Sequence, residues 1–225
     1  MTSAANLDLV DRLREQLATV ADPERAKAMA AYMRNQFPFL GVPSPKLKLA
    51  LRAAEPGRLA QAELTAVARR LWRLSEREYQ YAACALLNRF VHGCGPDFID
   101  VAHDLIVAKS WWDTVDTLAS HTVGTLVHKH PQLVTRMDEW IGSDNIWLAR
   151  TAILYQLRYK EATDVDRLFR YTLIKANHPD FFMRKAIGWA LRQYAWVAPE
   201  TVRAFVLANE AKFSGLTRRE ALKNL

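Results

Sequence analysis

The sequence predicts an all-α fold in which pairs of helices repeat along the chain. Glycine and proline are sparse, 8 and 9 of 225 residues, and they stand at the boundaries between apolar segments. Within those segments apolar residues recur at spacings of three and four, the helical period, and no segment shows the alternation typical of a strand. A 34-residue internal repeat supports the same fold, because it has the length of two helices with their turns.

Several helix starts are marked by residues that commonly precede a helix. The pair Asp22–Pro23 places a capping side chain before a proline at the first helical position. Ser75–Glu78 and Thr163–Asp166 fit the capping-box pattern, the second with Asp in place of Glu. Ala198–Pro199 predicts the start of another helix. Counted with the apolar periodicity, these signals predict about a dozen helices.

The repeat is clearest in the second half of the chain. Arg150–Arg158 and Arg184–Arg192 share the pattern R-x-A-I-x-x-x-L-R at an offset of 34 residues. Repeats of this size build α-solenoids, and the absence of tetratricopeptide signatures favours a HEAT-like or irregular stack of helical pairs. We therefore predict one domain over residues 1–225, with 35–45 as its only long irregular stretch.

Equivalent positions of stacked repeats line up along one surface of a solenoid. The aligned residues here would line a concave, basic groove of the kind that solenoids use for binding, or they would lie on an outer, solvated face. One row is formed by Gln80, Asp116, Arg150 and Arg184, and a second by Arg158 and Arg192.

The charge balance suits a nucleic-acid partner. The formal net charge is +7 and the isoelectric point is near 9.5, although many soluble proteins are equally basic. No apolar run reaches the roughly 20 residues that span a bilayer, and Met1–Asn6 lacks the features of a secretory signal. Two cysteines, Cys84 and Cys94, are expected to be reduced in a cytoplasmic protein.

Trp112 and Asp116 form the most informative pair in the chain. Four residues apart on a predicted helix, they share one face. An indole face and a carboxylate both attract cations, so on a basic chain the pair suits a ligand that is polyanionic overall and cationic at one point. A surface salt bridge or simple solvation is the alternative for Asp116. Ser110 is expected to cap this helix, with Asp113 in a structural role in its first turn.

The other tryptophans divide into one candidate site residue and several core residues. Trp189 follows Gly188, and glycine inside a helix costs roughly 1 kcal/mol relative to alanine, which indicates close packing or the close approach of a ligand. Trp111 points away from its neighbour Trp112 on a helix and is expected in the core. The remaining tryptophans are also assigned to packing: Trp72, Trp140, Trp147 and Trp196.

The sequence predicts neither a metal site nor a cofactor. His128 and His130 lie near a helix end, without the Cys or carboxylate side chains that would complete a zinc site. Phosphate-binding glycine loops and the G-x-S-x-G nucleophile motif are absent. No lysine stands out as a Schiff-base nucleophile.

Four stretches, taken in order, carry a resemblance to a known family: Tyr32–Val42, Lys109–Asp116, Trp147–Arg150 and Lys185–Trp189. They resemble the AlkD family of DNA alkylation repair glycosylases, which are built from HEAT-like repeats, and the resemblance covers nearly the whole chain. It implies a monofunctional enzyme that excises positively charged alkylpurines, chiefly 3-methyladenine and 7-methylguanine, from duplex DNA.

The resemblance also implies roles for individual residues. In the family an aspartate and two tryptophans contact the deoxyribose of the damaged nucleotide, and they match Asp116, Trp112 and Trp189. We expect these three to be catalytic, with Asp116 stabilising an oxocarbenium-like sugar and positioning a water. The residues expected to bind DNA are Arg150, Tyr32, Arg192, Arg158 and Lys185.

Duplex DNA is thus the expected partner, with no membrane and no obligate protein partner, in a cytoplasmic, nucleoid-associated protein. Two other functions stay open at this point. One is a non-catalytic binder of damaged or unusual DNA on the same scaffold. The other is a HEAT-like scaffold that binds proteins.

Overall fold

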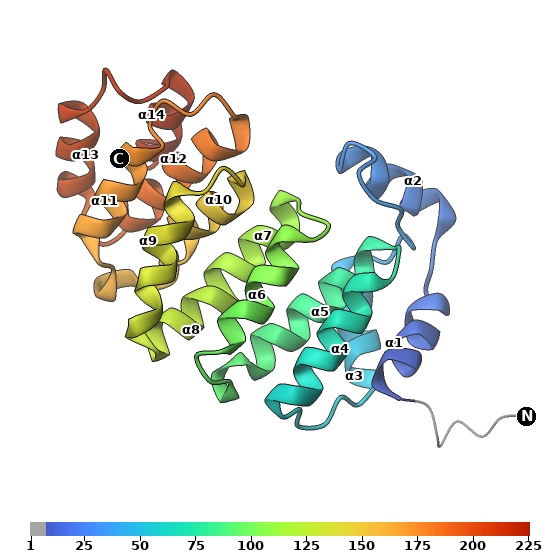
Figure 1. The fold of residues 1–225 in the computed structure, drawn as a ribbon. Coiled ribbons are helices and arrows are strands. Elements are labelled where there is room, and N and C mark those ends of the chain that lie inside the picture. The colour runs from blue at the N-terminus through green and yellow to red at the C-terminus, as the bar shows by residue number, and fades with distance from the viewer. Residues whose placement is uncertain (1–7) are drawn as a thin grey trace, which may run out of the picture. The chain divides into compact units, whose positions relative to one another are not determined.

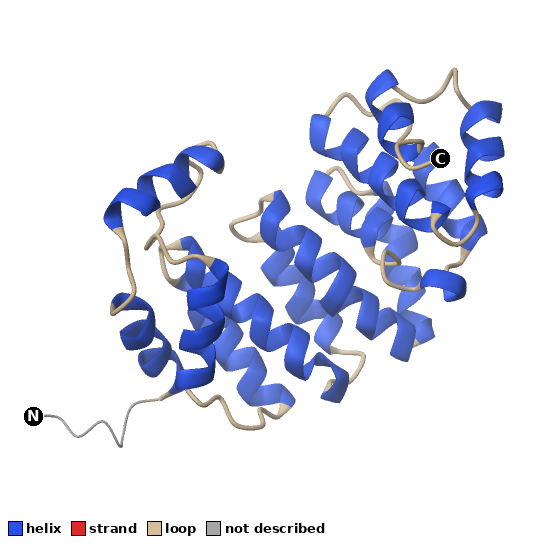
Figure 2. Cartoon of the chain, turned by 180° about the vertical axis from the view of Figure 1, so that it is seen from behind, coloured by secondary structure: helices blue, strands red, loops and turns tan. Residues whose placement is uncertain are grey.

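The structure is a computed structural model that describes residues 8–225, and Met1–Asn6, where no signal is expected, lies outside them. Throughout the described residues the regular structure is helical, with no strand (Figure 2). The predicted all-α fold is therefore confirmed. The chain folds as two compact units, Met1–Cys94 and Gly95–Leu225. That the whole chain acts as one domain stays a prediction.

The first unit packs four helices around an apolar core. Its buried side chains include Leu13, Leu64, Leu71 and Leu87. One helix, α2, buries none of its side chains, and Figure 1 shows it standing apart from α3, α4 and α5. The elements of this unit are α1 (Leu9–Ala18), α2 (Pro23–Tyr32), α3 (Ser44–Ala53), α4 (Gln61–Arg73), α5 (Arg77–Phe90) and the short 3-10 helix η2 (Val91–Gly93).

The irregular stretch after α2 is held in place by a buried carboxylate. Glu78 is fully buried and accepts backbone N–H groups of Leu40, Gly41 and Val42 at 2.9, 2.8 and 3.0 Å. Three donors to one carboxylate satisfy its charge without a cation. The capping box predicted at Ser75–Glu78 is therefore wrong. Helix α5 begins without a side-chain cap, because the carboxylate of Glu78 binds the loop after α2 instead of the start of its own helix.

The other predicted helix starts agree more closely with the structure. Asp22 accepts the backbone N–H groups of Glu24 and Arg25 ahead of α2, as expected. Asp164, and not Thr163, caps the helix over 165–174, one residue later than the capping-box pattern predicts. Pro199 opens its helix as predicted.

The second unit stacks its helices in succession, which is the arrangement predicted for an α-solenoid. Helix α10 lies at its centre and packs against α7, α9 and α12, while α12 packs in turn against α13 and α14. The elements are α6 (Phe98–Val107), α7 (Trp112–Thr117), η3 (Leu118–Val123), α8 (Gly124–Lys129), η4 (Pro131–Leu133), α9 (Val134–Gly142), α10 (Ile146–Leu154), η5 (Lys160–Ala162), α11 (Val165–Ile174), α12 (Phe181–Ala195), α13 (Pro199–Ala208) and α14 (Gly215–Ala221).

Contacts between successive repeats occur at the period read from the sequence. Side chains of one repeat bond to the equivalent part of the preceding repeat, at separations of 33 to 35 residues. The repeat is therefore structural as well as a sequence pattern. These contacts join Arg150 to Asp116, Tyr159 to the carbonyl of Gly124, Tyr171 to Asp138 and Thr217 to the carbonyl of Arg184.

The tryptophans assigned to packing have different environments. Trp72 and Trp140 are buried, as predicted, and Trp147 is half-buried among other rings. The prediction is wrong for Trp196, whose surface is 72% exposed. It caps the C-terminus of α12, one residue beyond Ala195, the last buried residue of that helix. Cys84 and Cys94 are buried free thiols, as expected.

Within residues 8–225 no helix combines the length and the hydropathy that crossing a bilayer requires.

Candidate active site

The site is built on a helix that changes its geometry midway. Residues 112–129 form one continuous helix, α-helical over α7 and α8 and π-helical over η3. At the change, the hydroxyl of Ser120 donates to the carbonyl of Asp116 at 2.8 Å, and the N–H of Gly124 donates to Ala119, five residues back. Segments of π-helix are rare and occur frequently at functional sites. Trp112 and Asp116 both precede the change, so they keep the shared face expected of an α-helix.

Asp116 forms a bidentate ion pair with Arg150. The Nε of Arg150 donates to Oδ1 at 2.7 Å, and Nη2 donates to Oδ2 at 2.8 Å. The third nitrogen, Nη1, donates to the backbone carbonyl of Phe182 near the start of α12. The Arg150 side chain is 5% exposed and that of Asp116 15%. One guanidinium thus ties α7, α10 and α12 together beneath the carboxylate.

This pairing keeps a negative charge on Asp116 in a largely buried place. Burial raises the pKa of the Asp116 carboxyl above its ordinary value of 3.8, and the hydrogen bonds and charge of Arg150 oppose that rise. Arginine stays protonated in proteins, and a bidentate pair is the strongest hydrogen-bonded arrangement for a carboxylate. The carboxylate is therefore paired with a permanent cation, oriented by three helices and still open to the surface on one side.

The open side of Asp116 faces a cleft with a volume of about 350 Å³. Trp189 of α12 lies in the same cleft, so the structure brings together two of the three predicted catalytic residues. The cleft is lined by Asp116, Thr117, Ser120 and His121 of the irregular helix, by Leu157 and Arg158 after α10, and by Trp189 and Gln193 of α12.

Trp111, directly before α7, packs against aromatic rings of α10 and α12. The ring of Trp111 packs edge-on against Phe182, with centroids 5.0 Å apart, and lies 5.8 Å from Trp147. Trp111 packs against these rings but is only half-buried, whereas the sequence predicted it in the core. Trp112 begins α7 and is also half-buried, but it is not among the described residues that line the cleft.

Ser110 does not cap α7, contrary to the sequence prediction. Its hydroxyl donates to the carbonyl of Ile106 at 2.7 Å and so closes the end of α6. Trp111 is the first flanking residue of α7, and it makes no side-chain capping bond. A serine hydroxyl between two helices can hydrogen-bond to the backbone of either one, and here it bonds to the end of the preceding helix. Asp113 does lie in the first turn of α7, where a carboxylate complements the helix dipole.

The basic residues predicted to bind DNA have different environments. Arg150 is buried against Asp116, so contact with a phosphate requires it to leave that carboxylate. Arg158 is exposed on the rim of the cleft. Arg192 and Lys185 both pair with Glu220 of α14, at 2.6 and 2.7 Å.

Glu220 shares its charge between these two cations on α12. Hydrogen bonding to Lys185, followed by that to Arg192, holds the pKa of the Glu220 carboxyl below its usual value. Tyr32 belongs to the first unit, where it ends α2 with its surface 73% exposed. The contacts with DNA predicted for all five residues, Arg150 and Arg158 included, stay predictions.

Gly188 allows α12 and α14 to pack closely beneath Trp189. A Cβ added at Gly188 would lie 2.4 Å from the Cβ of Glu220 and 2.9 Å from the backbone carbonyl of Thr217. Of the two reasons that the sequence suggests for this glycine, close packing is the one that the structure shows.

Replacing Gly188 with alanine is expected to lower the free energy of unfolding by about 1–3 kcal/mol, because α14 must move away to accommodate the methyl group. Urea denaturation of the two proteins measures the difference. Gly142→Ala, at the end of α9, is the matched control, since a Cβ there meets nothing within 4 Å. Equal stability of the Gly188→Ala variant and the wild type would contradict this account of the packing.

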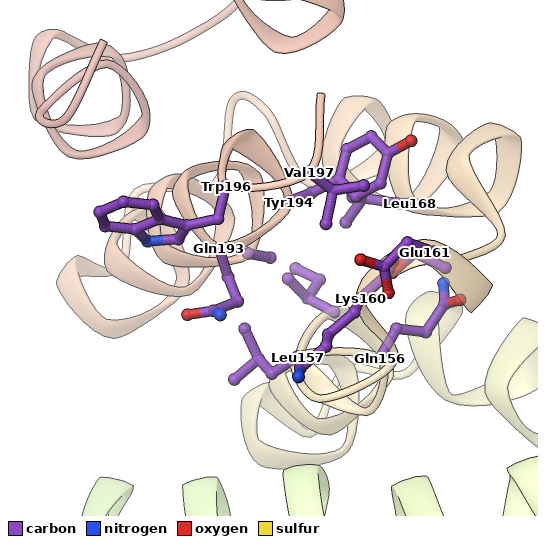
Figure 3. Close-up of a pocket in the computed structure, with 12 residues that line it drawn as sticks. Gln156, Leu157, Lys160, Glu161, Leu168, Gln193, Tyr194, Trp196 and Val197 are labelled. Atoms are coloured by element: carbon purple, nitrogen blue, oxygen red, sulfur yellow. The ribbon is translucent and has the colours of Figure 1, made fainter. Parts of the chain in front are cut away.

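A second cavity, of about 180 Å³, adjoins the cleft (Figure 3). It shares Leu157 and Gln193 with the cleft, so these two side chains form the wall between them. Figure 3 shows Glu161 and Val197 turned toward the cavity, whereas the ring of Trp196 points away from it.

Several residues of the cleft were not predicted from the sequence. His121, Thr117 and Ser120 come from the helix that carries Asp116, while Leu157 lies near the end of the first repeated motif and Gln193 directly follows the second. The 34-residue offset aligns Leu157 with Leu191, which is fully buried, and Gln193 with Tyr159, so the repeat carried no signal for the second pair. Among residues 8–225 no cluster of three His, Cys, Asp or Glu side chains is arranged to hold a metal ion.

The chain is similar to a known protein family and to solved structures. A family model described as DNA alkylation repair enzyme matches residues 13–225. A solved structure, described as a predicted DNA alkylation repair enzyme from Enterococcus faecalis, is 32% identical with a TM-score of 0.82, over 91% of this chain and 96% of that chain. The structure of the smu.31 protein from Streptococcus mutans UA159 shares the fold. It is 14% identical with a TM-score of 0.63, over 97% of this chain and 100% of that chain. No curated protein matches the chain.

Proposed function

Because this chain belongs to the family of DNA alkylation repair enzymes, we propose that it is a DNA glycosylase acting on positively charged N3- and N7-alkylpurines. The observation that carries the proposal is the carboxylate of Asp116, held ionised by Arg150 and exposed to the same cleft as Trp189. The proposed reaction is hydrolysis of the N-glycosidic bond in duplex DNA, with 3-methyladenine and 7-methylguanine as the substrate bases.

The leaving base needs little help from the protein. An alkylated purine already carries a positive charge, and it departs neutral when the bond to C1′ breaks. The charge then resides on an oxocarbenium-like sugar, next to the carboxylate of Asp116. Two unit charges 4 Å apart attract by about 4 kcal/mol at an effective dielectric constant of 20, and this attraction grows as the sugar becomes cationic. Uncharged purines gain far less, so they are expected to be poor substrates.

The tryptophans add to the stabilisation of the sugar. An indole face over a cation contributes about 0.5–2 kcal/mol. Trp189 lines the cleft, and Trp112 shares the helical face of Asp116. We assign both to contact with the deoxyribose. The reaction needs no covalent protein intermediate, which makes the enzyme monofunctional.

A buried carboxylate in a basic protein favours catalysis over simple DNA binding. The net charge of +7 attracts duplex DNA without reading its sequence. Asp116 reduces that attraction by neutralising Arg150, and removing its charge from water carries a cost of several kcal/mol. Such a residue serves a purpose if its target is a local cation within the polyanion. Exposed Arg158, with Arg192, Lys185 and Tyr32, is assigned to the DNA backbone, and such a protein acts at the nucleoid.

The proposal is tested by base release. Duplex DNA treated with a methylating agent is incubated with the protein, and the free bases are separated by chromatography. We expect 7-methylguanine and 3-methyladenine to appear faster than in protein-free duplex, and unmodified guanine not to appear. Duplex binding without base release would indicate a non-catalytic binder of damaged or unusual DNA. Neither binding nor release would indicate a scaffold for proteins.

A further inference from the structure

His121 shares the cleft of Asp116 because of the π-helical segment. The two residues are five positions apart, and in a regular α-helix they would be rotated by roughly 140° from each other. The wider turns of η3 bring His121 to the same side, where it lines the cleft with Asp116 and Trp189. The hydroxyl of Tyr159 donates to the carbonyl of Gly124 at 2.7 Å, directly after this segment, and helps to hold it in place.

The imidazole of His121 presents a lone pair to the cleft. Its Nε2 lies 3.5 Å from Nη1 of Arg158. Arginine has donors and no acceptor, so the ring nitrogen that faces it is the unprotonated one. Arg158 is exposed and reaches Nε2 only at the limit of a hydrogen bond, so a phosphate group would readily draw it away.

The surroundings of His121 keep the imidazole neutral. Burial, and then the charge of Arg158, lower its pKa below the usual value of 6.5. Asp116 is the acidic group of the same cleft, and its charge is taken up by Arg150 of α10. The charged side chains of α6 have partners of their own: Asp100 pairs with Arg136, and His103 with Asp104.

Asp116 is poorly suited to take up a proton during the reaction. Each of its oxygens accepts a hydrogen bond from Arg150. Protonating the carboxyl would leave a buried guanidinium without its counter-charge, which is strongly unfavourable. A neutral imidazole in the same cleft is better placed than Asp116 to accept the proton of the water that adds to the sugar.

We infer that His121 is a further catalytic residue, whose Nε2 accepts the proton of the water that attacks C1′. The inference rests on the proposed glycosylase function. The C1′–N bond breaks and its electron pair leaves with the base, which becomes neutral. A lone pair of the water oxygen forms the new C1′–O bond, and one water proton passes to Nε2. The resulting imidazolium releases that proton to solvent before the next turnover.

The test compares His121→Asn with the wild type in single-turnover release of 7-methylguanine, between pH 5 and pH 8.5. We expect release to be about 10- to 100-fold slower in the variant at pH 7, toward the lower range for a general base because the base departs unaided. In the wild type the rate should fall on the acid side, with a midpoint below pH 6.5, as the imidazole becomes protonated. That acid limb should be absent from the variant.

Two further variants separate chemistry from folding. His121→Gln places an amide of different reach in the cleft and should show the same loss of the acid limb. His128→Asn changes an exposed histidine at the end of the same helix, and it should keep both the rate and the limb. A His121→Asn variant that is slower at every pH but retains the acid limb would overturn the inference, because it would show a purely structural role.

A binding measurement distinguishes failure of this inference from failure of the proposed function. Duplexes carrying a cationic pyrrolidine abasic nucleotide are compared with duplexes carrying neutral tetrahydrofuran. The wild type should prefer the cationic duplex at pH 7.5, and should lose much of that preference near pH 5.5. In His121→Asn the preference should not change with pH. If the wild type releases 7-methylguanine and prefers the cationic duplex, but neither property changes in His121→Asn, the inference about His121 alone fails. If the wild type shows neither, the glycosylase proposal fails and the role of His121 with it.

Discussion

Replacing Asp116 with asparagine is expected to slow the release of 7-methylguanine by about 100- to 1,000-fold, while duplex DNA still binds. The amide has nearly the shape of the carboxylate, so Arg150 keeps an acceptor at Oδ1, but it loses its second acceptor and its counter-charge, and the free energy of unfolding should fall as well. What is lost is the negative charge beside the cationic sugar. Single-turnover release measures the first effect, and a titration with labelled duplex measures the second.

Asp113→Asn provides the matched control for this substitution. It removes the same charge from the same helix, one turn before Asp116, and it should change release by far less. Thermal unfolding of each variant shows that the fold is retained. Normal release by a folded Asp116→Asn protein would remove Asp116 from the mechanism and leave the cleft without its principal catalytic group.

Replacing Arg150 with alanine is expected to lower the free energy of unfolding by about 3–5 kcal/mol, because Asp116 is left largely buried without a cation. Release of the base should fall as well, since the carboxylate then becomes easier to protonate and loses its orientation. Arg150→Lys keeps the positive charge but not the fork that binds both oxygens, so its losses should be smaller in both respects. Urea denaturation and single-turnover release measure the two effects.

Salt dependence tests whether Arg150 also binds phosphate. A buried arginine that stays with Asp116 contributes nothing to the release of counterions from DNA, so its replacement should leave the slope of log K against log salt unchanged. Arg158→Ala is the comparison, because this exposed arginine should reduce the slope by about one. A reduced slope in a folded Arg150 variant would indicate that Arg150 leaves Asp116 when DNA binds, and would support the phosphate contact expected from the sequence.

The repeat made the proximity of Asp116 and Arg150 predictable, but not what the two do together. Their 34-residue offset put both residues in the same phase of successive repeats, and the structure places them in contact. An exposed arginine and a buried arginine occupy the same position in such a repeat pattern, so the pattern does not distinguish them. The difference depends on neighbours from elsewhere in the chain, here the carbonyl of Phe182 and the ring of Trp111.

His121 was missed for a different reason. The helical period that linked Trp112 to Asp116 assigns His121 to another face, and only a π-helical segment corrects this. Ser120 back-bonding to Asp116, and Gly124 at the end of the segment, are the local features that accompany the change. Neither is specific enough in a sequence to predict it. The cap predicted at Ser110 failed for a similar reason, because the sequence does not tell which of two flanking helices a short polar side chain will hydrogen-bond to.

The contacts of Arg150 also set the order in which the site can assemble during protein synthesis. Arg150 follows Asp116 by 34 residues, and Phe182 follows Arg150 by another 32. At about 5–20 residues per second, Asp116 waits roughly 2–7 s for its counter-charge and about as long again for the third contact. A nascent chain that stops before residue 182 therefore has the catalytic carboxylate without the complete arrangement that positions it. The proposed excision activity would therefore be acquired late in the synthesis of this chain.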